Sequence, residues 1–566
     1  MKFSAIATFL LGHCICSSQG QTETAPTVTT PLGTIEGFYN TTQNGRLYEA
    51  YQGIPYAEPP IGDLRFEVPR PISPWCNVLQ AKNYSSRCTQ PTAANTPGST
   101  SVTGSEDCLY LNVYTPLRES NESTAALFPV IFFIHGGAFK TGGGMDYKPT
   151  YLLDFDVVFI TMNYRLGTLG FLSTEDEIIP GNMGLKDQVM ALRWVQKNIE
   201  SFGGDPDRVM IVGHSAGGAS VHFHYMTDLT SGLFNSGMSI SGTALDCWCQ
   251  TEASLEKARK VASIVGCPTS EVRSMVDCLK TQPADQIAVT LTQFETFVSS
   301  PYSPFGPVVE MGDGEFTMID RPPIESITSG NVHDLPWITS VVSEEGLVPA
   351  AAFINNDTLL QTLNDNWTSI APELLEFNYT IPQADHADVS ELIRRHYIGY
   401  SDQINKTTIP QLVTMIGDRL YNYDAEIAAT TQAEVVSKGV WFYYFTYRGN
   451  HSFSEYYSGG STVNYGVSHL DDLAYVLDCF FNTTTTAEDR EMQKVMINMW
   501  VSFAESGKPD LGVDWEELSK SGDEFSYMKI AGPEDLYMEN NENFGQKKFW
   551  LSIGFDENTL EYPDYS

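Results

Sequence analysis

The chain has 566 residues, of which 42% are apolar and 18% charged, a composition typical of a globular protein with a large core. Its 33 Lys and Arg residues against 70 Asp and Glu residues give a net charge of −37. This charge excludes phosphate backbones as partners and disfavours anionic membrane surfaces. The sequence therefore predicts a soluble folded protein that binds no nucleic acid.

Residues 1–20 are predicted to be a signal peptide. Lys2 supplies a positive charge, residues 3–11 are mostly small and apolar but too few to span a bilayer, and Ser18 and Gly20 suit a cleavage site after Gly20. A buried first helix is the alternative. Because residues 562–566 carry neither a hydrophobic tail nor a retrieval signal, we expect a secreted, extracellular protein with no membrane anchor.

Strand-like and helix-like segments alternate from about residue 110 onward. Unbroken apolar runs, typical of strands buried on both faces of a parallel sheet, occur at residues 130–134, 157–160 and 209–212. Apolar residues at helical spacing over 186–201 predict a crossover helix between the second and third runs. Near the end, Thr486 and Asp489 predict a capping box before another amphipathic helix.

This order predicts an α/β fold with a central, mostly parallel sheet and helices on both faces. Since no repeat or long linker interrupts the sequence, we expect residues 21–566 to form a single domain.

The apolar run at 209–212 leads directly into Gly213-His214-Ser215-Ala216-Gly217, which fits the G-x-S-x-G nucleophile elbow. Such a tight strand-to-helix turn exposes the serine hydroxyl at the N-terminus of a helix, here predicted over 216–226, where the helix dipole favours negative charge. The pattern also arises by chance in long chains, so the strand before it and the helix after it carry the argument. Ser215 is the predicted nucleophile.

A second glycine-rich segment, His135-Gly136-Gly137-Ala138-Phe139, directly follows the run at 130–134. Lipases and esterases place a loop of this type where its backbone N–H groups stabilise an oxyanion. The alternative is a simple turn. A phosphate-binding loop is excluded because no Gly-Lys-Ser/Thr follows at 142–145.

In α/β hydrolases the triad follows the chain order serine, acid, histidine. The unassigned histidines after Ser215 are His333, His386, His396, His451 and His469. Of these, His469 has the surroundings most typical of a site, at residues 465–472, although a structural histidine is the alternative for each. The residues alone leave the acid unassigned, because spacing cannot choose among the acidic residues downstream of Ser215.

Cysteines and glycosylation sequons agree with an oxidising compartment. The cysteines that remain after cleavage at Gly20 are Cys76, Cys88, Cys108, Cys247, Cys249, Cys267, Cys278 and Cys479. Sequons for N-glycosylation occur at Asn40, Asn83, Asn121, Asn356, Asn366, Asn378, Asn405, Asn450 and Asn482. The cysteines contain no CxxC pair, so we predict neither a metal site nor a cofactor.

The chain resembles the type-B carboxylesterases, the cholinesterase-like α/β hydrolases, throughout its mature length. The segments that match the family's motifs lie at residues 50–60, 64–66, 106–113, 163–167, 182–188, 202–206 and 500–509. Several long motifs in the same order make the resemblance specific. Within the family the sequence is most similar to secreted insect β-esterases and their antennal, venom and juvenile-hormone-type relatives.

The resemblance supplies the residues that spacing leaves open. The family's acidic-Glu-Gly step corresponds to Glu344-Glu345-Gly346, which implies Glu345 as the acid, and His469 falls on the family's catalytic histidine. The implied oxyanion donors are the backbone N–H groups of Gly137, Ala138 and Ala216, with Gly136 completing the loop. The family's disulfide positions imply the pairs Cys88–Cys108 and Cys267–Cys278.

Two departures bear on the substrate. Cholinesterases carry a glutamate just before the nucleophile and a tryptophan in the first disulfide loop, whereas this chain has His214 and no tryptophan between Cys88 and Cys108. Both argue against choline specificity. We expect a monomeric or homodimeric esterase for small, lipophilic, neutral esters. The alternatives are a cholinesterase and a non-enzymatic neuroligin-like adhesion protein, although the latter class lacks one or more triad residues.

Overall fold

The computed structural model describes residues 25–92, 100–117, 126–298, 300–312, 314–400, 403–520, 524–555 and 557–558. The predicted signal peptide and Asn121 lie outside these residues.

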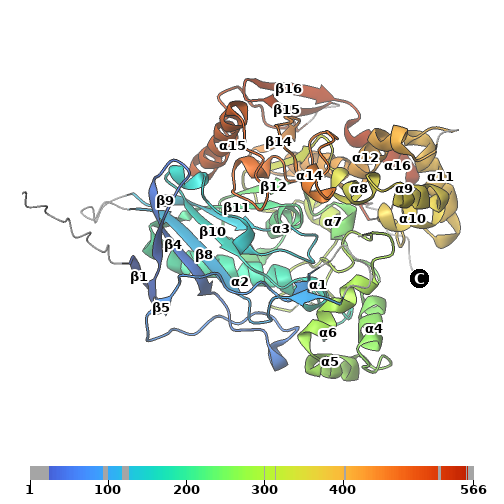
Figure 1. Ribbon diagram of the computed structural model, residues 1–566. Helices are drawn as coiled ribbons and strands as arrows, with labels where there is room; N and C mark the ends of the chain where they lie inside the picture. Colours follow the sequence, from blue (N-terminus) through green and yellow to red (C-terminus); the bar gives the residue numbers. More distant parts are fainter. Residues whose placement is uncertain are drawn as a thin grey trace, which may run out of the picture.

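A large mixed sheet forms the centre of the molecule (Figure 1). Its strands are β3 (Phe38–Thr41), β4 (Leu47–Pro55), β8 (Tyr110–Pro116), β9 (Phe128–Ile134), β10 (Val158–Met162), β11 (Gly204–His214), β12 (Ser236–Ile240), β13 (Trp337–Val342), β14 (Val440–Phe445), β15 (Phe525–Gly532) and β16 (Asp535–Asn541). They are arranged in the order β16-β15-β14-β13-β12-β11-β9-β10-β8-β4-β3. The strands from β10 to β15 are parallel, and antiparallel strands extend both ends.

The predicted apolar runs are strands buried on both faces. In β9, Val130 and Phe132 pack into the cluster that contains residues of α2 (Met183–Asn198) and α3 (Ala216–Tyr225). Ile131 and Phe133 point to the other face, which is covered by α15 (Ala487–Ser506). This alternation between two apolar layers is why the run shows no polar positions, and it confirms the predicted α/β fold.

Helix boundaries differ only slightly from those predicted. The crossover helix α2 begins at Met183, three residues earlier than the apolar periodicity indicated, and gives way at Ile199 to a 3₁₀ turn. At the start of α15, the Thr486 hydroxyl accepts the N–H of Asp489 at 3.0 Å and the Asp489 carboxylate accepts the N–H of Thr486 at 2.8 Å. The predicted capping box is thus confirmed.

Two helical blocks lie outside the sheet. The first follows β12 and contains α4 (Ser254–Ile264), α5 (Val272–Thr281) and α6 (Ala284–Ala288). The second follows β13 and contains α8 (Leu347–Ile354), α9 (Asp357–Asp365), α10 (Trp367–Leu374), α11 (His386–Tyr397), α12 (Ile409–Gly417) and α13 (Tyr423–Val435), with α16 (Lys547–Ile553) beside them. Figure 1 shows the first block below and the second to the right of the sheet.

A segment near residue 557 is docked against the second block. Arg419 is fully buried, its guanidinium lies 2.6 Å from the carboxylate of Glu557, and the ring of Phe555 stacks 4.0 Å beneath it. The Asn558 amide donates to the Asp424 carboxylate at 2.9 Å. Burying a guanidinium is costly unless it is paired, so Phe555, Glu557 and Asn558 help to enclose this part of the core.

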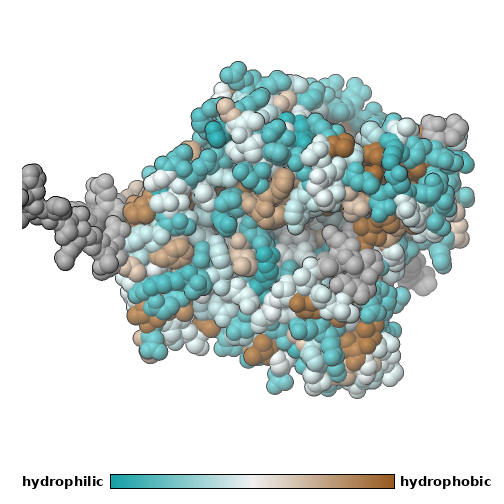
Figure 2. All heavy atoms as spheres, viewed as in Figure 1, coloured by the Kyte–Doolittle hydropathy of each residue, from teal (hydrophilic) through white to brown (hydrophobic). Residues whose placement is uncertain are grey.

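The outer surface is predominantly polar, in keeping with the charge of −37. Figure 2 shows hydrophilic residues over most of the visible face, with hydrophobic residues in small separate groups. Over the described residues, no helix combines the length and the apolar character needed to cross a membrane.

Candidate active site

The nucleophile elbow joins β11 to α3. Ser215 lies between them with φ 58° and ψ −126°, a strained backbone conformation for a residue with a side chain. The flanking glycines are required by close packing: a Cβ on Gly213 would lie 2.1 Å from the Gly217 carbonyl oxygen, and one on Gly217 would lie 2.0 Å from that of Ile134. The local sequence therefore dictates the turn.

The glycine-rich loop after β9 lies against the nucleophile. A Cβ on Gly136 would meet the carbonyl oxygen of His214 at 2.6 Å and the Cβ of Ser215 at 2.9 Å. Gly137 and Ala138 both have positive φ, 111° and 52°. No described residue accepts a hydrogen bond from the backbone N–H groups of Gly137, Ala138 or Ala216, which leaves three donors available for an oxygen at this position.

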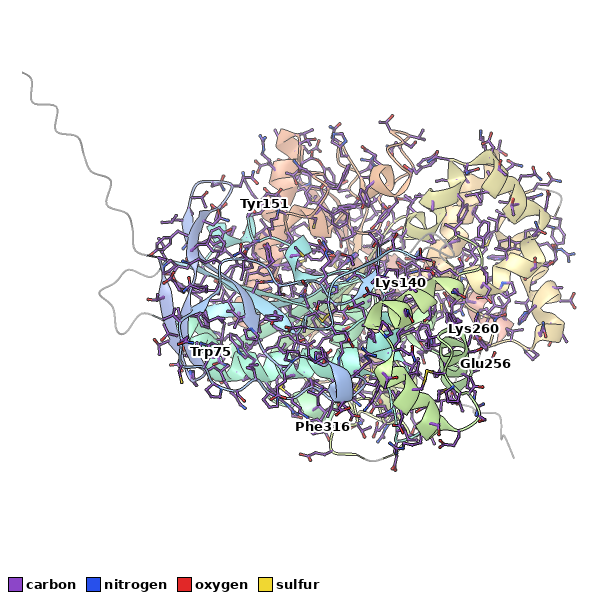
Figure 3. All side chains as sticks on the ribbon, turned by 60° about the horizontal axis from the view of Figure 1, so that its bottom comes forward. Trp75, Lys140, Tyr151, Glu256, Lys260 and Phe316 are labelled. Atoms are coloured by element: carbon purple, nitrogen blue, oxygen red, sulfur yellow. A yellow bond between two sulfur atoms is a disulfide. The ribbon has the colours of Figure 1, made fainter. Side chains whose placement is uncertain are left out.

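Two side chains from the segment after the first helical block hold this loop in place. Lys140, labelled in Figure 3, pairs with Glu295 at 2.9 Å, and both side chains are buried. The Ser303 hydroxyl donates to the carbonyl oxygen of Ala138 at 3.0 Å. The oxyanion loop is therefore fixed by long-range contacts as well as by its own turn.

Glu345 and His469 form a buried pair although they are 124 residues apart in the chain. His469 Nδ1 lies 2.6 Å from Glu345 Oε2, and the other carboxylate oxygen accepts the N–H of Val342 at 2.8 Å. His469 Nε2 is buried and has no hydrogen-bond partner among the described residues. The arrangement orients the imidazole and leaves its second nitrogen free to exchange a proton.

The loop that carries His469 is held by backbone contacts to two carboxylates. Glu344 and Val467 bond to one another twice: the Glu344 N–H donates to the Val467 carbonyl oxygen at 3.1 Å, and the Val467 N–H donates to the Glu344 carboxylate at 2.6 Å. Asp471 accepts the N–H groups of Phe453 and Ser468 at 2.7 and 2.8 Å. The contacts of Glu344 with Val467 and of Asp471 with Phe453 join segments that are far apart in the sequence, whereas the bond from Ser468 to Asp471 lies within the loop itself.

Burial governs the ionisation of the site. Desolvation raises the pKa of Glu345 and lowers that of His469, whereas their 2.6 Å contact favours the charged pair. His214 packs against His469 with 4.3 Å between ring centroids, and burial, together with the neighbouring imidazole, lowers its pKa well below the usual value. The side chain next to the nucleophile is therefore neutral.

Two tyrosines complete the surroundings of Ser215, and sequence reasoning missed both. The Tyr421 hydroxyl donates to that of Tyr302 at 2.9 Å, and the Tyr421 ring packs on His469 with 5.0 Å between centroids. Burial raises the pKa of Tyr302 to about 12, while hydrogen bonds with Tyr421 and Ser215 lower it. No motif marks either residue, since each lies in a segment of irregular or helical structure far from the elbow in sequence.

The other candidate histidines have partners elsewhere. His333 contacts the Thr227 carbonyl oxygen, His386 that of Ile381, His396 the ring of Phe549, and His451 the Glu455 carboxylate. Of the five, only His469 packs against the residue that precedes the serine.

Both cysteine pairs implied by the resemblance, Cys88–Cys108 and Cys267–Cys278, are disulfide-bonded in the structure. The remaining described cysteines are unpaired: Cys76, Cys247, Cys249 and Cys479. Seven sequon asparagines are exposed: Asn40, Asn83, Asn356, Asn366, Asn405, Asn450 and Asn482; Asn378 is half-buried.

The eleven-stranded sheet with a strained serine between β11 and α3 defines an α/β hydrolase. The model of the carboxylesterase family matches residues 24–550, and the chain belongs to this family. It is 48% identical to a carboxylic ester hydrolase of Bombus ignitus over 99% of both chains, and 46% identical to venom carboxylesterase-6 of Apis mellifera over 95% of this chain and 96% of that one. The protein is a carboxylic ester hydrolase.

A solved structure agrees. The crystal structure of juvenile hormone esterase from Manduca sexta, with OTFP covalently attached, superimposes with a TM-score of 0.80 at 26% identity. The match covers 94% of this chain and 99% of that one.

Proposed function

We propose that the protein is a secreted serine carboxylesterase that hydrolyses neutral carboxylic esters through an acyl-enzyme on Ser215, with Glu345 and His469 completing a triad. The observation that carries this proposal is the 2.6 Å contact of Glu345 with His469 Nδ1, next to an elbow whose backbone presents the serine and with Nε2 left without a partner.

In the first half-reaction, Ser215 Oγ attacks the ester carbonyl carbon while its proton passes to His469 Nε2. The tetrahedral intermediate then collapses: the carbon–oxygen bond to the alcohol breaks, and His469 returns the proton to the leaving oxygen. Glu345 holds the imidazole in the tautomer protonated at Nδ1 and stabilises its charged form. In the second half-reaction, water attacks the acyl carbon by the same proton path and restores Ser215.

The oxyanion would be stabilised by the N–H groups of Gly137, Ala138 and Ala216, with Gly136 giving the loop its close approach to the serine. These donors have no acceptor among the described residues and need no reorganisation when charge develops. The N-terminus of α3 adds a favourable dipole at the same point.

The surroundings support neutral, lipophilic esters as substrates. A quaternary ammonium that has lost its water needs a carboxylate or an aromatic face. His214 occupies the position before the nucleophile, and burial keeps it uncharged. The loop closed by Cys88–Cys108 contains no tryptophan. A neutral ester loses nothing by either difference.

Secretion, N-glycosylation and a single domain over residues 21–566 belong to the same proposal. The apolar N-terminal segment, two disulfides and exposed sequons support an extracellular protein, and one of the relatives is named as a venom enzyme. Strands that begin at Phe38 and end at Asn541 share one sheet, which supports one domain.

Side-by-side kinetics test the substrate class. We expect kcat/KM for naphthyl acetate to exceed that for acetylthiocholine by at least about tenfold, the factor that 1.4 kcal/mol of lost cation binding produces. Ser215→Ala serves as the blank for non-enzymatic hydrolysis. Equal efficiency on the two acetates would move the assignment to the cholinesterases.

A further inference from the structure

An exposed aromatic patch lies beside the short helix α14 (Phe453–Tyr457). Tyr456 is 54% exposed and Phe480 is 49% exposed, and their rings lie 5.1 Å apart between centroids. Beneath them the buried ring of Phe453 contacts Phe480 edge-on at 5.3 Å. Two large rings that lie together at the surface, each about half exposed to water, form an apolar patch on which another group can pack.

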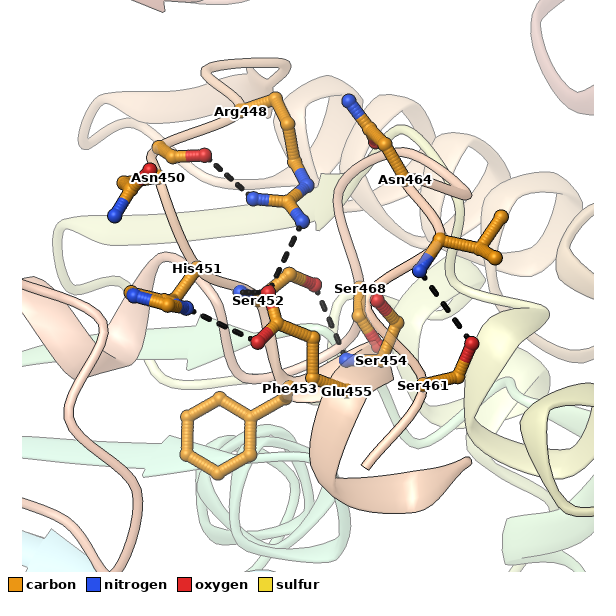
Figure 4. Close-up of polar contacts among 12 residues, drawn as sticks. Arg448, Asn450, His451, Ser452, Phe453, Ser454, Glu455, Ser461, Asn464 and Ser468 are labelled. Carbon is orange, nitrogen blue, oxygen red and sulfur yellow. Dashed lines mark hydrogen bonds and ion pairs between the residues drawn. The ribbon is translucent and has the colours of Figure 1, made fainter. Parts of the chain in front are cut away.

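The patch rests on a rigid base, part of which is drawn in Figure 4. The Ser452 hydroxyl and the Glu455 carboxylate form a capping box at the start of α14, and Glu455 also binds His451 at 3.0 Å. Phe453 donates its N–H to Asp471 at 2.7 Å, which links the base of the patch to the loop that carries His469.

A glycosylation sequon begins two residues after Phe480, in Phe480-Phe481-Asn482-Thr483-Thr484. The chain bends at Phe480 and Phe481, and Asn482 is exposed. The Asn482 side-chain oxygen accepts the Thr484 N–H at 3.0 Å, which fixes the carboxamide. No described residue accepts a hydrogen bond from its amide nitrogen, the atom to which a sugar is attached.

Three of the other sequons, those at Asn366, Asn405 and Asn450, differ in this respect. The amide nitrogen of Asn366 donates to the Thr362 carbonyl oxygen at 2.9 Å, that of Asn405 donates to the Gln403 carbonyl oxygen at 3.1 Å, and that of Asn450 donates to the Thr485 hydroxyl at 3.1 Å. Attachment of a sugar there would disturb an existing contact.

We infer that Asn482 carries an N-linked glycan whose first sugar packs its apolar face on the ring of Phe480, with Tyr456 beside it. A pyranose ring presents several polarised C–H groups on one face, and these are attracted to the negative face of an aromatic ring. The sugar removes apolar ring surface from water without hiding its own hydroxyl groups. This inference rests on the proposed secretion, because only the secretory pathway attaches such glycans.

Two matched variants at Thr484 distinguish the effect of losing the glycan from the effect of changing the side chain. The Thr484 hydroxyl is buried and has no hydrogen-bond partner among the described residues, so Thr484→Val removes the sequon without breaking a contact. Thr484→Ser keeps the sequon. In protein secreted from insect cells, we expect peptide mass spectrometry to find Asn482 occupied in the wild type and in Thr484→Ser. We expect Thr484→Val to unfold about 1–3 °C lower than either.

Phe480→Ala tests the contact itself. In that background, Thr484→Val should change the unfolding temperature by less than half as much, because the sugar has lost its ring. Trimming the glycans of the folded wild type to their first sugar should leave its unfolding temperature unchanged. Thr358→Val, which removes the sequon at Asn356, shows the effect of losing a glycan where the nearest aromatic residue in sequence, Phe353, is buried.

The outcomes distinguish the claims. Occupied sequons elsewhere with Asn482 bare, or a Thr484→Val effect that Phe480→Ala leaves unchanged, would overturn the inference. A concentration-dependent dimer that Phe480→Ala dissociates would also overturn it, by assigning the patch to a second copy. Sequons that are bare throughout would instead contradict the proposed secretion.

Discussion

The nucleophile elbow and the Glu345–His469 pair are built in opposite ways. The elbow consists of consecutive residues, and its geometry is imposed by backbone contacts that leave no room for a Cβ on Gly213 or Gly217. The pair joins residues 124 positions apart, and its geometry depends on hydrogen bonds that the carboxylates of Glu345 and Glu344 accept from His469 and from backbone N–H groups. One region is specified by sterics over five residues, the other by polar contacts between distant segments.

The difference shows how each region responds to change. The energy of a steric clash rises sharply as atoms approach, so the close contacts at Gly213 and Gly217 allow the elbow only one backbone conformation. A hydrogen bond contributes only about 0.5–1.5 kcal/mol net, so the pair loses its geometry in graded steps as its contacts are removed.

The largest effect on activity is expected from removing the hydroxyl of Ser215 in the elbow. Ser215→Ala should lower kcat/KM for naphthyl acetate on the order of 10⁴-fold or more, because the oxyanion donors remain but the nucleophile is gone. Circular dichroism should show an intact fold, and an organophosphate should label the wild type only. A variant that retains comparable turnover would contradict the proposed mechanism.

Removal of the charge from the distant pair should cost less. Glu345→Gln keeps the size of the side chain but removes the carboxylate that stabilises the imidazolium, and we expect kcat to fall on the order of 10³-fold. Glu345→Asp, which keeps the charge with a shorter reach, is the matched control and should retain more activity. If Glu345→Gln were as active as the wild type, another residue would have to be the acid.

The pH profile sharpens the same comparison. His469 must be neutral to act as a base. As the pH falls, the Glu345–His469 pair binds a proton, His469 can no longer accept the proton of Ser215, and kcat/KM falls. Burial lowers the pKa of His469, and the Glu345 carboxylate beside Nδ1 opposes that shift by stabilising the imidazolium. In Glu345→Gln only burial remains, and we expect the acid limb to move to lower pH by about 1–3 units. An unmoved limb would separate Glu345 from His469 in function.

The smallest effect is expected from the loop beneath the histidine. The Asp471 carboxylate accepts hydrogen bonds from the backbone N–H groups of Phe453 and Ser468. In Asp471→Asn the amide NH₂ group would face one of these two donors, and that hydrogen bond would be lost. We expect a loss of about 1–3 kcal/mol in urea unfolding and less than about tenfold in kcat/KM. Asp535→Asn, at an exposed carboxylate on β16, is the control and should unfold like the wild type.

Much of the fold could be predicted because its signals are local. The apolar runs that became β9, β10 and β11 are buried by layers on both faces, and this burial removes every polar position from them. The elbow and the capping box at Thr486 are likewise contained in a few consecutive residues.

The rest of the site depends on contacts that no local pattern encodes. Glu345 emerged only from family resemblance, because nothing in its own segment shows that a loop carrying Val467 and His469 will lie beside it. Tyr302 and Tyr421 come from segments that follow different strands: Tyr302 interacts with Ser215, and Tyr421 contacts both Tyr302 and His469. Tertiary pairing, rather than propensity, places these groups.

The buried Arg419 sets a condition on how the protein can be synthesised. Its guanidinium is paired with Glu557, a residue translated long after it, and Asn558 completes the same contact region through Asp424. Until that segment has been translated, the guanidinium lacks its carboxylate partner Glu557, so we expect the second helical block to pack less stably. A chain that terminates before Glu557 would therefore bury Arg419 without that counterion, and we expect it to be less stable than the full-length protein.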